Sequence, residues 1–102
     1  MAASFQFEIL TPEKTLYSSE ITSLVAPGLE GYFGVLAHHA PLLARSKGGK
    51  LKVRETSGQE NFFQVGSGIV EVFKNRALFL TRDARQITGA QAKTNPAETK
   101  QV

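Results

Sequence analysis

Apolar and polar residues alternate with a period of two through most of the first 88 residues. The alternation is clearest at 5–9 and 51–53, and short runs rich in Val, Ile, Leu and Phe lie at 21–25, 62–65, 69–73 and 77–81. A period of two places successive side chains on opposite faces of a strand, so these segments are predicted to be strands. Residues 1–88 show no sustained helical period, and only 39–45 is compatible with one short helical turn.

Turn-forming pairs separate these runs. They are Thr11-Pro12, Pro27-Gly28, Gly48-Gly49, Ser57-Gly58 and Lys74-Asn75. Gly48-Gly49 and Ser57-Gly58 are predicted to be hairpin turns, because glycine adopts a positive φ without steric cost. Turns spaced about 8–12 residues apart are typical of all-β folds, so we expect a two-sheet antiparallel β-sandwich or flattened barrel over residues 1–88.

Residues 89–102 differ in kind from the rest. The segment reads GAQAKTNPAETKQV, with no large apolar side chain before Val102 and a helix-interrupting Asn95-Pro96. Such a segment buries too little apolar surface to offset the entropy cost of ordering. We therefore predict a short disordered C-terminal tail.

Composition bounds the possible functions. The 102 residues suit one domain, and 41% apolar with 21% charged residues is ordinary for a globular protein. The absence of cysteine excludes a disulfide scaffold, a thiolate zinc site and a cysteine nucleophile. No apolar run is long enough for a membrane span, and the first residues do not resemble a signal peptide, so a soluble protein is expected.

Basic residues are concentrated in the second part of the chain, most densely at 45–54. The members of this stretch are Arg45, Lys47, Lys50, Lys52 and Arg54. Nucleic-acid binding is one hypothesis for such a stretch, but it contains no aromatic residue on which a base could stack. The alternation instead favours the solvated face of a strand.

Titratable residues give little indication of catalysis. His38 and His39 are adjacent, so on a strand they would point to opposite faces and could not readily share a metal. Asp83 with Arg82 and Arg85 is more typical of a surface charge cluster than of an acid–base group. No phosphate-binding loop or nucleophile motif is present, so we predict no enzyme activity, no metal and no cofactor.

The segment 27–43, PGLEGYFGVLAHHAPLL, combines three glycines with two aromatics. Tyr32 and Phe33 are adjacent, which predicts one ring facing inward and one outward. An exposed tyrosine on a tight turn is typical of an interface anchor, so we assign Tyr32 that role and place Phe33 in the core.

Motifs at separated places resemble the epsilon subunits of F-type ATP synthases. They are Glu8-Ile9-Leu10-Thr11-Pro12-Glu13-Lys14; Glu30-Gly31 with Phe33-Gly34-Val35-Leu36; His39-Ala40-Pro41-Leu42-Leu43; Val65-Gly66-Ser67-Gly68-Ile69-Val70-Glu71-Val72; and, in degraded form, residues 77–85. The resemblance implies the family's β-sandwich of two antiparallel sheets. It also implies a non-catalytic central-stalk subunit that binds the gamma subunit and the c-ring and couples proton-driven ring rotation to ATP synthesis.

The resemblance also suggests site residues. Its ring-contacting loop falls on Glu30, Gly31, Tyr32, Phe33 and Gly34, and its gamma-contacting region falls near Thr11, His39, Ala40 and the segment that ends at Ala44. Tyr32 stands where many relatives carry a polar or acidic residue, and Ala37-His38 replaces the usual Pro-Gly.

The remaining expectations from the resemblance concern form and location. We expect a short form without the C-terminal helical hairpin or its nucleotide site. The isolated subunit would be a monomer without nucleic-acid partners. It would be peripheral on the cytoplasmic face of the bacterial inner membrane, reaching the membrane only through the c-ring. The alternative hypothesis is a stand-alone β-sandwich module that binds a peptide, glycan or nucleic acid through the basic strand 45–54.

Overall fold

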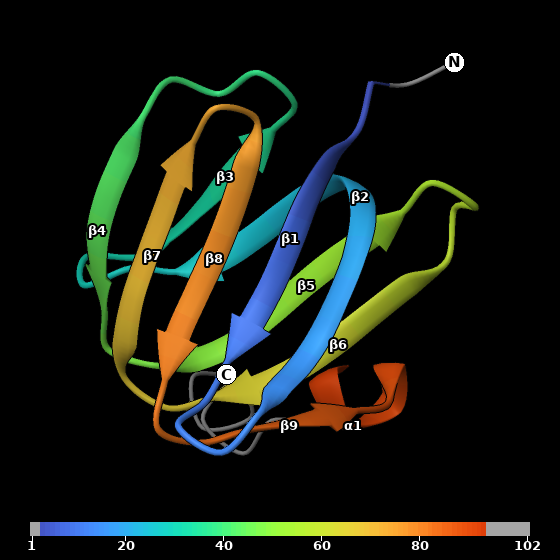
Figure 1. Ribbon diagram of the computed structural model, residues 1–102. Coiled ribbons are helices and arrows are strands. Elements are labelled where there is room, and N and C mark those ends of the chain that lie inside the picture. Colours follow the sequence, from blue (N-terminus) through green and yellow to red (C-terminus); the bar gives the residue numbers. More distant parts are fainter. Residues whose placement is uncertain (1–2, 94–102) are drawn as a thin grey trace.

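The computed structural model describes residues 3–93, which form nine strands and one helical turn (Figure 1). The elements are β1 (Phe5–Leu10), β2 (Thr15–Pro27), β3 (Tyr32–Leu36), β4 (Leu42–Ser46), β5 (Gly49–Glu55), β6 (Glu60–Val65), β7 (Gly68–Phe73), β8 (Arg76–Thr81), β9 (Ala84–Ile87) and α1 (Gly89–Lys93). The all-β prediction is therefore confirmed. Each segment predicted to be a strand lies within an observed one.

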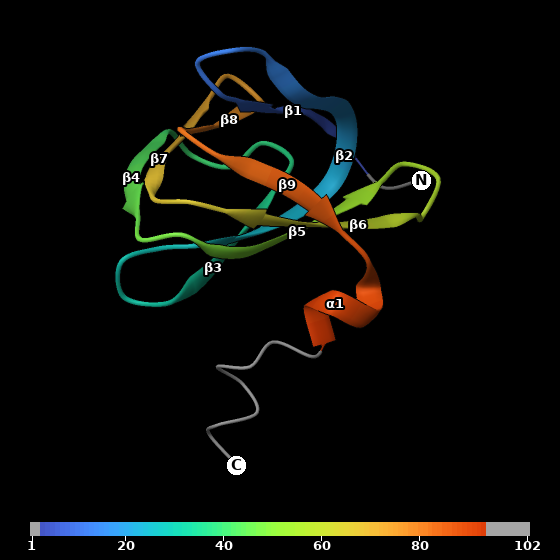
Figure 2. The ribbon, with the colours of Figure 1, turned by 90° about the horizontal axis from the view of Figure 1, so that it is seen from below.

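Two layers of strands pack face to face, and the long strand β2 belongs to both (Figures 1 and 2). The first half of β2 pairs with β1, which continues through β8 and β7 to β4. Its second half pairs with β3 and β5, and β5 continues through β6 to β9. A register irregularity between Ile21 and Ser23 marks the crossover. The β1–β8 pair is parallel, which the expectation of two antiparallel sheets did not include.

The core lies between the layers and is built from the inward residues of each strand. Fully buried members include Phe5, Phe7, Ile9, Ile21, Leu24, Leu51, Val53, Phe63, Val70 and Phe79. In β1 and β5 these are the apolar positions of the sequence alternation, so the predicted inward faces are confirmed. Burying one such side chain stabilises the fold by about 1.5–3 kcal/mol.

Three local predictions were wrong. Residues 42–46 form β4 rather than a helical turn, because pairing with β7 satisfies their backbone. Gly48-Gly49 does not close a hairpin: β4 pairs with β7 and β5 pairs with β2, so these glycines carry the chain between layers. Strand β9 lies beyond the segment expected to be the last strand.

The other turns agree with the sequence. Ser57-Gly58 lies in the β5–β6 hairpin, closed by the Gly58 N–H donating to the Glu55 carbonyl at 2.9 Å. Lys74 and Asn75 have φ of 52° and 60°, the positive values that a two-residue type I′ turn requires.

Helix α1 occupies Gly89–Lys93, where disorder was expected from residue 89. Thr88 and Gln91 form a reciprocal capping box: the Gln91 N–H donates to Thr88 Oγ1 at 3.0 Å, and the Thr88 N–H donates to Gln91 Oε1 at 2.8 Å. At the other end the Lys50 ammonium donates to the carbonyl of Gln91 at 2.9 Å and to that of Ala92. The rest of the predicted tail, 94–102, lies outside the described residues.

Candidate functional site

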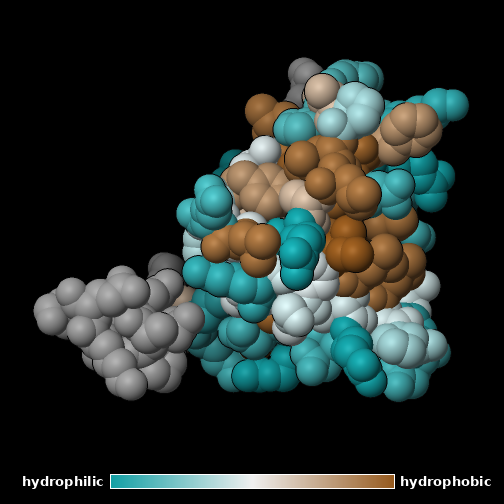
Figure 3. Space-filling model, turned by 90° about the vertical axis from the view of Figure 1, so that its left-hand side faces the viewer, coloured by the Kyte–Doolittle hydropathy of each residue, from teal (hydrophilic) through white to brown (hydrophobic). Residues whose placement is uncertain are grey.

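An unusually apolar surface covers the outer side of the layer β4–β7–β8–β1. We call it the apolar face and define it by Leu43, Ile69, Phe73, Leu78 and Leu80. Leu43 is 74% exposed and Phe73 52% exposed. Figure 3 shows hydrophobic side chains gathered on the side of the molecule where β4 lies. Such a continuous apolar surface is typical of a protein interaction site.

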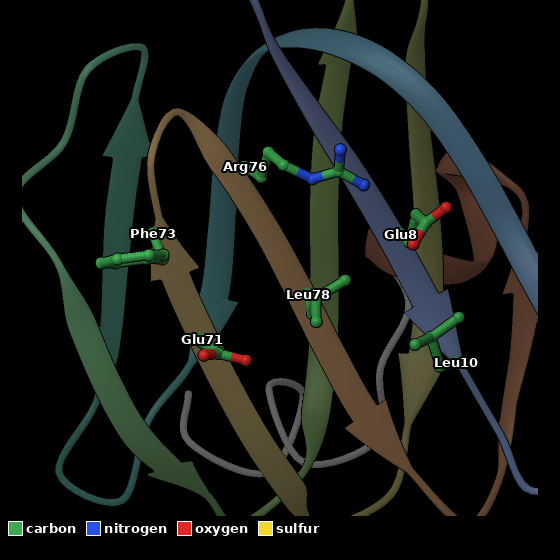
Figure 4. Close-up of a pocket in the computed structure, with 6 residues that line it drawn as sticks. All are labelled: Glu8, Leu10, Glu71, Phe73, Arg76 and Leu78. Carbon is green, nitrogen blue, oxygen red and sulfur yellow. The ribbon is translucent and has the colours of Figure 1, made fainter.

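A shallow groove of about 300 Å³ crosses this face. It is lined by Glu8, Leu10, Glu71, Phe73, Arg76 and Leu78 (Figure 4). Strand register explains the arrangement, because Glu71 pairs with Leu78 and Leu78 pairs with Glu8. The groove therefore mixes apolar walls with three charged side chains.

The β2–β3 turn presents a second exposed group. The Gly28 N–H donates to the Gly31 carbonyl at 2.8 Å, and Gly31 has a φ of 138°, which favours glycine. Tyr32 is 59% exposed, whereas Phe33 is half-buried and packs against the core. The predicted division between these two rings is therefore observed. The five residues assigned to ring contact form one continuous segment, with Glu30 and Gly31 exposed.

The four residues assigned to gamma contact do not form one surface. Thr11 follows β1 and lies at one end of its layer. The paired residues across that end of the layer are Leu10, Leu80, Ile69 and Arg45. His39 and Ala40 precede β4 and so lie toward its opposite end.

Ala44, the fourth gamma candidate, lies in the inward row of its layer, because it pairs with the buried Val70. Its neighbour Leu43 points outward instead. From the sequence alone Leu43 could be placed only within the segment that ends at Ala44, and nothing showed that Ile69, Phe73 and Leu80 share a face with it. The period-two alternation within β4, β7 and β8 was the available signal, but it does not tell which outer face is apolar enough to bind a partner.

The histidines have structural contacts. The His38 N–H donates to Asn75 Oδ1 at 2.7 Å, and His38 has a positive φ of 64°. His39 Nδ1 lies 2.6 Å from the Ala40 carbonyl oxygen. Within residues 3–93 no group of three His, Cys, Asp or Glu side chains could hold a metal ion. No helix among these described residues is long and apolar enough to cross a membrane.

The basic strand uses its charges within the molecule. Lys50, Lys52 and Arg54 alternate with buried Leu51 and Val53, as predicted. Lys50 binds α1, while Lys52 and Arg54 lie 3.8 Å and 2.6 Å from the Glu60 carboxylate. These contacts disfavour a free nucleic-acid surface.

A polar cluster holds the two layers together away from the apolar face. The Tyr17 hydroxyl donates to Glu55 Oε2 at 2.6 Å, and Asn61 Nδ2 donates to the same oxygen at 2.7 Å. The Tyr17 ring lies 4.9 Å from that of Phe63, centroid to centroid. Burial and, secondly, the hydrogen bond to Glu55 raise the pKa of Tyr17 above its usual value.

Comparisons with known proteins agree with this geometry. The family described as "ATP synthase, Delta/Epsilon chain, beta-sandwich domain" matches residues 4–87. The ATP synthase epsilon chain of Chlorobium limicola is 44% identical over 80 residues, which cover 78% of this chain and 91% of that protein. The epsilon chain of Dichelobacter nodosus is 33% identical over 84 residues, covering 82% of this chain and 59% of that one.

A solved structure shares the fold. A chain in the Euglena gracilis mitochondrial ATP synthase structure, which contains OSCP, F1 and the c-ring, superposes with a TM-score of 0.78. The identity is 17%, and the superposition covers 99% of this chain and 66% of that one. With a family match over residues 4–87 and relatives above 40% identity, the chain belongs to the delta/epsilon family of ATP synthase subunits and is an epsilon-type β-sandwich.

Proposed function

We propose that this subunit is a non-catalytic rotor component that binds the gamma subunit and the c-ring. In that role it couples proton-driven ring rotation to ATP synthesis, which takes place elsewhere in the complex. The observation that carries the proposal is the apolar face, exposed in a member of a family whose proteins function within a larger assembly. A face of this kind is stabilised when a partner covers it.

The gamma subunit is the proposed occupant of the apolar face. Of the residues first assigned to this contact, Ala44 sits inward on β4, and its neighbour Leu43 takes the outward position. Thr11 and His39–Ala40 lie toward opposite ends of the same layer. A partner large enough to cover the face would reach both ends. Leu43 and Phe73 are its proposed anchors because they are large and more than half exposed.

The β2–β3 turn is the proposed contact with the c-ring. Its exposed segment presents Glu30 and Tyr32 on a turn closed by the Gly28–Gly31 hydrogen bond. A short closed turn loses little conformational freedom on binding. The subunit would thus be peripheral to the membrane, on the cytoplasmic face in a bacterium, and held there through the ring. Family membership favours this role over the stand-alone module, and three of the five basic residues of 45–54 have contacts within the chain.

Calorimetric titration with the purified gamma subunit tests the proposal. The unmodified chain should bind one-to-one, and Leu43→Ala should weaken binding by about tenfold or more, or at least about 1.4 kcal/mol. Leu36→Ala is the matched control, because Leu36 is a comparably exposed leucine, at 65%, on the other layer. The proposal fails if the unmodified chain does not bind folded gamma, or if both variants bind equally well.

A further inference from the structure

Glu71 lies in the middle of the apolar face. Leu43 and Leu78 are its partners on the two adjacent strands, and Ile69 and Phe73 precede and follow it on the same side of β7. Among residues 3–93 its carboxylate makes no hydrogen bond or ion pair. A partner that covers the apolar face would therefore cover a lone carboxylate.

The other charged groups of the groove, Glu8 and Arg76, lie on the β1 side of Leu78 (Figure 4), and within residues 3–93 Arg76 makes no ion pair with Glu71. Glu8 accepts a hydrogen bond from Ser18 Oγ at 3.2 Å. In Figure 4 the guanidinium of Arg76 extends over β1 on the side of Glu8, whereas Glu71 lies on β7, on the far side of Leu78. Lys74 is outside the groove, with its ammonium 5.3 Å from the Phe73 ring centroid. Two carboxylates and one guanidinium leave the groove with one negative charge in excess, and no cation among residues 3–93 pairs with Glu71.

Covering that charge with apolar groups alone is costly. A carboxylate removed from water without a compensating partner carries a penalty of several kcal/mol. A cation supplied by the partner offsets that penalty and excludes partners without one. Leu78 and Phe73 add apolar surface on which the methylene stem of a long basic side chain could lie.

We propose that a Lys or Arg side chain of the gamma subunit enters this groove and pairs with Glu71. Its stem lies along Leu78 and Phe73, and its charged head meets the Glu71 carboxylate. This inference rests on the proposed function, because it takes gamma as the occupant of the apolar face. In this arrangement Glu71 selects for a basic residue on the partner. Leu43 and its apolar neighbours supply the affinity that comes from apolar contact.

The test compares two isosteric variants by titration with gamma. Glu71→Gln removes the charge and keeps the shape. It should weaken binding by about 30-fold, or about 2 kcal/mol, and lower the salt dependence of the affinity. Glu20→Gln is the matched control, because Glu20 is an exposed carboxylate on the same outer side, paired with Gln6 at the β1–β2 end of the layer. Its affinity for gamma should stay within about twofold of the unmodified chain.

Two further results separate this inference from the function on which it rests. If Glu71→Gln binds gamma as tightly as the unmodified chain while Leu43→Ala does not, gamma covers the face without a cation and the inference is wrong. If the unmodified chain does not bind gamma at all, the proposed function itself fails. Thermal unfolding of both glutamine variants should match the unmodified chain, because neither carboxylate is buried in the free subunit.

Discussion

Replacing Gly68 with alanine tests the most crowded backbone contact in the sandwich. Gly68 begins β7, where it pairs with Ser46 of β4 and Thr81 of β8. A Cβ at this position would lie 2.0 Å from the Leu80 carbonyl oxygen, 3.0 Å from the Leu80 carbonyl carbon and 3.2 Å from Thr81 Cα. All three are backbone atoms, so no side-chain rotation relieves the clash. Strand β8 would have to move away by about 1 Å or more.

The cost follows from that movement. Overpacking of this kind destabilises by about 1–3 kcal/mol. Separation of the strands also weakens the hydrogen bond from Thr81 Oγ1 to the Ser67 carbonyl, now 2.9 Å, which adds about 1 kcal/mol. The expected loss of unfolding free energy is therefore about 2–4 kcal/mol, and the midpoint of thermal unfolding should fall by about 10–25 °C in a domain of this size.

Circular dichroism during heating and in urea would measure the loss. Gly34→Ala is the matched control, because a Cβ there would have only the Leu24 carbonyl oxygen, at 3.8 Å, as a neighbour. That variant should be neutral or slightly stabilising, by up to about 1 kcal/mol. If Gly68→Ala unfolds within about 0.5 kcal/mol of Gly34→Ala, the close approach of β7 and β8 does not limit the fold and the reasoning is refuted.

Three other measurements address separate features. Tyr32→Ala should weaken binding to the c-ring or to a gamma–c-ring complex by about 2 kcal/mol or more, and unchanged binding would remove Tyr32 as an anchor. Because the pKa of Tyr17 is raised in the folded state, its hydroxyl contributes stability below about pH 10, and this contribution is lost as the pH rises through the folded pKa. The unfolding free energy of Tyr17→Phe, measured in urea, should therefore decrease less at alkaline pH than that of the unmodified chain. An equal decrease in both proteins contradicts the assignment. Lys50→Met should speed hydrogen exchange at the Ala92 amide, which bonds to the Thr88 carbonyl at 2.9 Å, and unchanged exchange would mean that Lys50 does not hold α1.

Local patterns in the sequence were sufficient for the strands and for several turns. Period-two alternation by itself places Phe5, Phe7 and Ile9 on one face of their strand, because a strand presents alternate residues to opposite faces, and all three are buried. Lys74-Asn75 is a turn signal, and both residues have the positive φ of a two-residue hairpin. The motifs around Glu30–Gly34 and Val65–Val72 placed the chain in its family, which the family match confirms.

Tertiary structure alone decided which strands are neighbours. The parallel pairing of β1 with β8 joins residues about 70 positions apart, and no local pattern encodes it. Residues 42–46 became a strand because β7 offers a pairing edge, and Gly48-Gly49 links two layers because its flanking strands have different partners. In β4 Leu43 and Ala44 point to opposite faces, and the position of the second layer decides that Leu43 is the exposed one.

The same limit applied to the candidate site. The segment 30–34 could be found from sequence because one continuous turn carries it. The residues that form the apolar face around Glu71 could not, because they come from three strands that long-range pairing brings side by side. Local composition determines what each strand can bury, whereas the closure of the sandwich determines which apolar residues remain outside it.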